Sequence, residues 1–89
     1  MIIRYDPDFL DTLKKAKVNI RKSFKEAMVV FYYNSHDSRL NNHPLKGEWK
    51  GSCSIDVTSN WRAIYTEKQE GKDIVAYFVA IGTHEQLYK

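Results

Sequence analysis

Histidine and arginine are the side chains of this 89-residue sequence best suited to proton transfer and phosphate binding. Histidine exchanges protons near neutral pH, because imidazole ordinarily has a pKa of about 6.5. Arginine stays charged and can donate two parallel hydrogen bonds to phosphate oxygens. Cleavage of RNA without a metal requires a base for the 2′-hydroxyl, an acid for the departing 5′-oxygen, and positive charge beside the phosphate. His43, His84 and Arg62 are candidates for these tasks.

Three short segments in the second half of the chain carry these residues. The segment HPLKGEWKG begins at His43, NWR ends at Arg62, and GTH ends at His84. Histidine alone is more often structural than catalytic, so the motifs and not the residue type single out His43 and His84. His36 lies in a polar loop outside these motifs, and we do not count it as a candidate.

Hydrophobic periodicity predicts the elements of the first half. Residues 2–5 resemble a short strand, and Asp6-Pro7 supplies the cap and the first-turn proline of a helix extending to Lys17. Apolar residues at helical spacing continue in a second helix, capped by Asn19 and ending near Tyr33. The simplest interpretation is a helical hairpin.

The second half changes to the period of a sheet. Residues 34–42 are polar and predict a loop, and 52–58 alternate between apolar and polar residues as a half-buried strand does. Residues 61–66 and 73–81 are rich in β-branched and aromatic residues and predict two more strands, joined by the polar loop EKQEGKD. The predicted fold class is α+β, with two helices packed against an antiparallel meander and a short N-terminal strand.

The turn at residues 58–60 decides which side chains share a face. A two-residue turn at either Thr58-Ser59 or Ser59-Asn60 places Trp61 on the face of Ser54 and Asp56. We therefore expect that face to carry the site. The same parity puts Arg62 on the opposite face, so that it must reach round a strand end or use a strong twist.

Composition limits the alternatives. A chain of this length has one core, so residues 1–89 are expected to form a single domain. Hydrophobic residues make up 43% and no run of about 18 apolar residues occurs, and the N-terminus lacks the features of a secretory signal, so we expect a cytoplasmic protein without membrane contact. Cys53 is alone, which excludes an internal disulfide. The net charge of +3 fits either an anionic partner or a solvated basic helix face.

The order of these motifs resembles the RelE/ParE toxin superfamily, and HPLKGEWKG and GTHEQLY are most similar to YafQ-type mRNA interferases. The resemblance covers the whole chain, although only about the last fifty residues carry specific motifs. It implies a RelE-like fold and a toxin of a type II toxin-antitoxin system that cleaves mRNA in the ribosomal A site without metal or cofactor. The implied partners are a cognate antitoxin, mRNA, and operator DNA only through the antitoxin complex.

The resemblance also implies roles for individual residues. His84 matches a catalytic histidine of YafQ-like toxins and is the first candidate for general acid or base. Arg62 matches an arginine of RelE that stabilises charge at the phosphate, and Tyr88 matches a C-terminal aromatic residue that stacks on a base or assists proton transfer. His43 matches a histidine implicated in YafQ-like activity. The expected RNA-binding residues are Lys46, Lys50 and Trp61.

Three positions depart from the family pattern. Ser54 and Asp56 replace two lysines of RelE, or an acid and a histidine of YafQ-like toxins, and Ala80 replaces an arginine. Asp56 could accept a proton or orient a histidine, but a carboxylate also repels phosphate. Two alternatives therefore stay open: a ParE-like toxin that inhibits DNA gyrase without chemistry, and a catalytically degenerate member that only binds its antitoxin.

Overall fold

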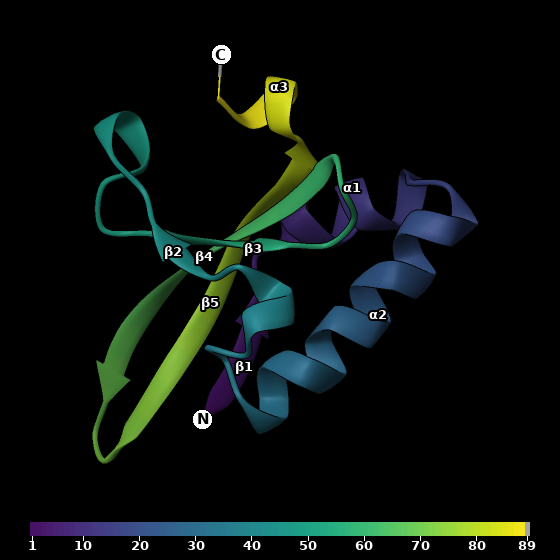
Figure 1. Ribbon diagram of the computed structural model, residues 1–89. Helices are drawn as coiled ribbons and strands as arrows, with labels where there is room; N and C mark the ends of the chain where they lie inside the picture. The colour runs from purple at the N-terminus through teal and green to yellow at the C-terminus, as the bar shows by residue number, and fades with distance from the viewer. Residues whose placement is uncertain (89) are drawn as a thin grey trace.

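The expected α+β class is confirmed by the computed structural model, which describes residues 1–88 (Figure 1). Its sheet has the strand order β1-β5-β4-β3-β2. The strands are β1 (Ile2–Tyr5), β2 (His43–Pro44), β3 (Cys53–Asp56), β4 (Trp61–Glu70) and β5 (Asp73–Thr83). The helices are α1 (Pro7–Lys15), α2 (Val18–Tyr33) and α3 (His84–Leu87), with 3-10 turns η1 (Ser38–Leu40) and η2 (Gly47–Trp49). Lys89, the last residue of the predicted domain, lies outside the described residues.

The helical hairpin forms as predicted, with different ends. Asp6 caps α1 by accepting a hydrogen bond from the Asp8 amide at 2.9 Å, and Pro7 occupies the first turn. The helix ends at Lys15 and not at Lys17, because Ala16 adopts extended backbone and Arg21 donates to the carbonyl oxygens of Lys14 and Ala16. Asn19 is not a cap, since α2 already begins at Val18.

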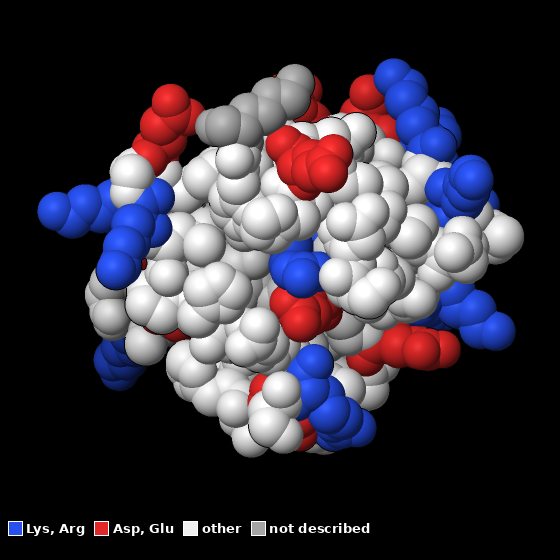
Figure 2. All heavy atoms as spheres, turned by 45° about the horizontal axis from the view of Figure 1, so that its top comes forward, with Lys and Arg blue, Asp and Glu red and all other residues white. Residues whose placement is uncertain are grey.

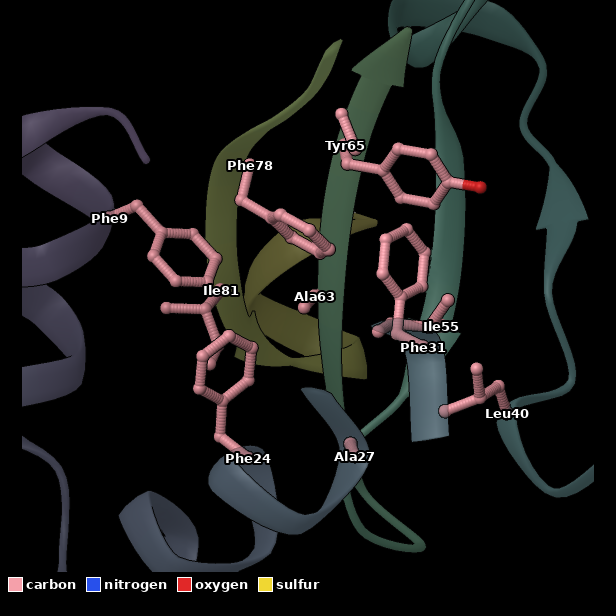
Figure 3. Packing of buried hydrophobic residues seen from close by; sticks show 11 residues of the cluster. Phe9, Phe24, Ala27, Phe31, Leu40, Ile55, Ala63, Tyr65, Phe78 and Ile81 are labelled. Carbon is pink, nitrogen blue, oxygen red and sulfur yellow. The ribbon is translucent and has the colours of Figure 1, made fainter. Parts of the chain in front are cut away.

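Aromatic residues from both helices and the sheet form the core (Figure 3). Phe9 of α1 and Phe24 and Phe31 of α2 point toward Phe78 at the centre of β5, with ring centroids 5.3–6.2 Å from it. These four side chains are 1–5% exposed or fully buried. Burying an aromatic side chain of this size contributes about 2 to 3 kcal/mol, so the cluster fixes the helices on one face of the sheet.

The meander of β3, β4 and β5 is confirmed, but the sheet is larger than predicted. β1 pairs in parallel with β5, and β2 adds a fifth strand through His43 opposite Ser54. The polar segment EKQEGKD, predicted as the loop between the last two strands, is mostly the end of β4. This strand continues to Glu70, and the chain then turns tightly at Gly71, where φ is +60°. Long paired strands tolerate polar residues where both faces meet water.

The predicted parity of the β3–β4 turn is wrong. The register pairs Asp56 with Arg62, with the five residues 57–61 between them. A two-residue turn would instead leave an even number of residues between any two paired residues of the strands. Arg62 therefore shares a face with Asp56, and Trp61 points to the other face. A bulge near Tyr65 then shifts the register with β5 so that Phe78 and Ile81 both face the core.

Candidate functional site

The sheet face opposite α1 and α2, here called the site face, collects the candidate residues. Cys53, Ile55 and Ala63 pack toward the helices, so the alternate residues of their strands point away from them. Residues directly opposite each other in the ladder share a face. The register therefore places on the site face the row His43, Ser54, Ile64, Ala80 and the row Asp56, Arg62, Gly82.

The C-terminal segment lies over this face. The Tyr88 hydroxyl donates to the Ser54 hydroxyl at 3.0 Å, and the rings of His84 and Tyr88 meet edge to face with centroids 4.7 Å apart. Ser54 and Ile64 are both 0% exposed although they point away from α1 and α2. The segment carrying His84 and Tyr88 is thus part of what covers the site face.

α3 starts at a well-defined point. Thr83 and Gln86 form a reciprocal capping box, and the His84 amide donates to the Asn60 carbonyl oxygen at 2.9 Å. Gly82 permits the chain to fold back closely, because a Cβ there would lie 3.0 Å from the Gln86 Oε1 and 3.5 Å from Leu87. The glycine of the GTH motif therefore has a packing role, and the threonine caps the helix on which the histidine lies.

His43 is held in one tautomer by its own turn. Its Nδ1 lies 2.8 Å from the carbonyl oxygen of Asn41, a residue in left-handed conformation with φ of 48°. A carbonyl oxygen only accepts hydrogen bonds, so the neutral ring carries its hydrogen on Nδ1 and leaves Nε2 free to accept a proton. The side chain is exposed, which makes Nε2 accessible.

Asn42 anchors the loop that leads to His43. Its Nδ2 donates to the Ser35 carbonyl oxygen at 2.8 Å and to the Tyr65 hydroxyl at 2.7 Å. Tyr65 is 2% exposed, and burial raises its pKa to about 12. Burial likewise raises the pKa of the Cys53 thiol, which favours the protonated form and speaks against a nucleophilic role.

Asp56 and Arg62 form an ion pair across the ladder. The Arg62 Nε lies 3.0 Å from the Asp56 Oδ1. The Arg62 side chain is 17% exposed and the Asp56 side chain 29%. The Nη atoms of Arg62 donate to the carbonyl oxygens of Thr58, Ser59 and Trp61. Most of the guanidinium donors are therefore engaged with the turn, and the fork is not free to bind a phosphate in this arrangement.

Lysines border the site face at the η2 turn. Lys46 lines a pocket of about 280 Å³ together with Trp49, Leu87 and Tyr88, and Lys50 follows on the same turn; both lysines are exposed. Figure 2 shows lysine and arginine mainly at the margins of this side of the molecule, with acidic groups among them, around a centre where one basic group touches an acidic one. An extended anion could cross such a surface with cations at its edge.

Trp61 is the predicted site residue that the structure separates from the others. It packs against the core from the helix side of the sheet and lines a different pocket, of about 620 Å³, with residues of the α1–α2 turn. The predicted parity puts Arg62 on the opposite face, whereas the register pairs it with Asp56 on the site face. Ser54, which departs from the family pattern, accepts the hydrogen bond from the Tyr88 hydroxyl.

Within residues 1–88, no group of three histidine, cysteine, aspartate or glutamate side chains is placed to hold a metal ion. None of the helices in this part of the chain has the length and apolar character needed to cross a membrane.

Comparison with known proteins identifies relatives along the full length. The family described as "Bacterial toxin of type II toxin-antitoxin system, YafQ" matches residues 2–89. None of the curated proteins matches the sequence.

Solved structures share the fold. YafQ from E. coli strain BL21(DE3) has a TM-score of 0.78 at 24% identity, covering 98% of this chain and 97% of that one. The match in the E. coli DinJ-YafQ toxin-antitoxin complex has a TM-score of 0.72 at 27% identity, covering 98% and 96%. A YoeB/ParE toxin from Agrobacterium tumefaciens has a TM-score of 0.75 at 15% identity, covering 94% and 99%.

Proposed function

Because the chain belongs to the YafQ family of bacterial type II toxins, which matches residues 2–89, we propose that it is a metal-independent endoribonuclease that cleaves mRNA at the ribosome. The observation that carries this proposal is the gathering of two histidines on one face of the sheet. His43 lies on β2, opposite Ser54 in the ladder. His84 lies on α3, where its ring contacts that of Tyr88, and the Tyr88 hydroxyl donates a hydrogen bond to Ser54. Two histidines on the same face can supply both the general base and the general acid that this reaction requires.

The tautomer of His43 suggests which histidine acts as the base. Its free Nε2 removes the proton of the 2′-hydroxyl, and the 2′-oxygen then bonds to phosphorus as the bond to the 5′-oxygen breaks. His84, entering in its protonated form, gives its proton to the departing 5′-oxygen. The products are a 2′,3′-cyclic phosphate and a 5′-hydroxyl, and exchange with water returns both histidines to their starting forms.

The other candidates act around this pair. Tyr88 uses its hydroxyl hydrogen to bond Ser54, which favours a role in stacking and in holding His84 over direct proton donation. Asp56 and Arg62 neutralise each other and hold the β3–β4 turn, so a positioning role suits them better than direct contact with phosphate. Lys46 and Lys50 bind the RNA backbone from the edge of the site face.

A cognate antitoxin is the proposed protein partner. YafQ and a Staphylococcus aureus YoeB have been solved in complex with DinJ and YefM respectively. By the same family relationship, we expect a neighbouring gene to encode a protein that binds this chain and blocks cleavage, and operator DNA to be bound through that complex only. The working compartment of such a toxin is the cytoplasm, where its mRNA substrate is translated.

The test is cleavage of a reporter mRNA in a translating bacterial extract. We compare the wild type with His43→Ala and His84→Ala, and use His36→Ala as the matched control because His36 is an exposed histidine in the turn after α2 and lies outside the three motifs. The wild type and the control should cut within codons, and each of the other two variants should lose about 10²- to 10⁴-fold in rate.

The product ends and a gyrase assay separate the alternatives. Fragments with a 2′,3′-cyclic phosphate and a 5′-hydroxyl support the proposed reaction. Inhibition of gyrase supercoiling without RNA cleavage would instead indicate a ParE-like toxin. Neither activity in folded protein would indicate a member that only binds its antitoxin.

A further inference from the structure

The segment KGEWKG forms a turn with a fixed shape. Gly47 and Gly51 have φ of +66° and +93°, in the left-handed region that favours glycine; Gly47 begins the 3-10 turn η2, which ends at Trp49, and Gly51 follows two residues later. The Ser52 amide donates to the Trp49 carbonyl oxygen at 2.9 Å and ties the turn to the start of β3. This backbone holds the Trp49 side chain in one place beside α3.

Trp49 donates a hydrogen bond to the end of α3. Its indole Nε1 lies 2.9 Å from the Leu87 carbonyl oxygen, 38 residues away in the sequence. Leu87 is the last residue of α3, so its carbonyl oxygen has no helical partner and needs a donor from elsewhere. Figure 1 shows α3 and the η2 turn at the same end of the sheet.

α3 cannot hold itself in place. It has 4 residues, and an isolated helix that short is unstable in water. At its start, the His84 amide is bonded to the Asn60 carbonyl oxygen at 2.9 Å. At its end, the attachments are Trp49 to the Leu87 carbonyl oxygen and Tyr88 to Ser54. The position of the His84 and Tyr88 rings on the site face therefore depends on both ends.

We propose that Trp49 is a positioning residue for the RNA cleavage proposed above: its indole N–H fixes the end of α3 and thereby the placement of His84 and Tyr88. Trp49 does not itself act on the RNA. One turn then serves two purposes, because Lys46 and Lys50 on either side of Trp49 hold the RNA backbone while Trp49 holds the segment with the catalytic histidine. Displacement of a catalytic group by about 1 Å can cost about 10²-fold in rate.

The test replaces the indole by a ring without a donor. Trp49→Phe keeps an aromatic side chain in the turn and removes the hydrogen bond to Leu87. We expect the single-turnover cleavage rate to fall about 10- to 100-fold while the affinity for RNA stays within about twofold. Lys50→Ala should instead weaken RNA binding, because that lysine acts through its charge. Tyr33→Phe, on an exposed side chain of α2, is the control and should change neither quantity.

Hydrogen exchange tests the attachment independently of catalysis. In Trp49→Phe, the Tyr88 amide, which bonds to the His84 carbonyl oxygen, should exchange at least about tenfold faster than in the wild type, while amides of β4 keep their protection. In the wild type, the Trp49 indole hydrogen should be protected from exchange. This last measurement needs no variant, so it tests the hydrogen bond between Trp49 and Leu87 even if Trp49→Phe fails to fold.

The outcomes separate this proposal from the proposed function. If the wild type cleaves no RNA, the proposed function is wrong, and the exchange data alone decide whether Trp49 holds α3. An unprotected indole hydrogen, or a folded Trp49→Phe protein with wild-type cleavage and wild-type exchange at Tyr88, would overturn the positioning role.

Discussion

Removing the Tyr88 hydroxyl should destabilise the protein more than removing its partner on Ser54. The two oxygens are 3.0 Å apart, but their surroundings differ: Ser54 is 0% exposed, whereas Tyr88 is partly exposed. Tyr88→Phe leaves a buried serine hydroxyl without its partner, which costs about 1 to 3 kcal/mol. Ser54→Ala loses the same hydrogen bond, but the Tyr88 hydroxyl can turn to water, so the cost is about 0.5 to 1.5 kcal/mol.

The double variant gives the decisive comparison. Ser54→Ala combined with Tyr88→Phe removes both polar groups, so no buried hydroxyl is left unpaired. Its unfolding free energy should therefore exceed that of Tyr88→Phe alone, with a coupling energy of about 1 kcal/mol. In a chain of this length, each kcal/mol corresponds to about 4 to 8 °C in Tm.

Urea unfolding of the four proteins at pH 7 measures these differences. The m value should stay constant, so that changes in midpoint report stability alone. Equal unfolding free energies for Tyr88→Phe and the wild type would refute the reasoning, because the hydroxyl would then make no contact that matters. A double variant less stable than Tyr88→Phe would also contradict it.

Three further predictions follow from the ion pair, the lysines and the buried tyrosine. Arg62→Ala leaves the Asp56 carboxylate unpaired, so it should lower the unfolding free energy measured in urea by about 1 to 3 kcal/mol and also slow cleavage. Slower cleavage with unchanged stability would point instead to direct contact between Arg62 and the phosphate. Lys46→Ala and Lys50→Ala should each reduce the slope of log affinity against log salt by about 0.7 in RNA-binding titrations, and an unchanged slope would remove them from the RNA path. The pKa of Tyr65 is raised from 10.0 to about 12 in the folded state, so its contribution to stability is present below pH 10 and should be lost as the pH rises toward 12. Alkaline unfolding curves should show this loss in the wild type and not in Tyr65→Phe.

The helices and the meander could be predicted because their signals are local. Apolar residues at helical spacing identify the face that Phe9, Phe24 and Phe31 present to the sheet, and that face is the one buried. Alternation along residues 52–58 likewise identifies a strand with one side in the core. The ends of these elements were less predictable, since the end of α1 depends on the Arg21 side chain contacting carbonyl oxygens of the preceding turn.

The β3–β4 turn shows how one residue changes a site prediction. Side chains alternate with a period of 2, so a turn longer or shorter by one residue moves every following side chain to the other face. The sequence favoured a two-residue turn and put Trp61 beside Asp56; the register instead puts Arg62 there and Trp61 against the core. Nothing local in residues 57–61 distinguishes these turns.

The sequence alone determined the family, the α+β class and the segments that carry the histidines, because motif order and hydrophobic period are properties of neighbouring residues. Only the tertiary structure decided which side chains meet. The contacts of Trp49 with Leu87 and of Ser54 with Tyr88 join residues 38 and 34 positions apart. Such pairs form only after the strand register and the docking of α3 are set by packing over the whole sheet, so no short stretch of sequence contains them.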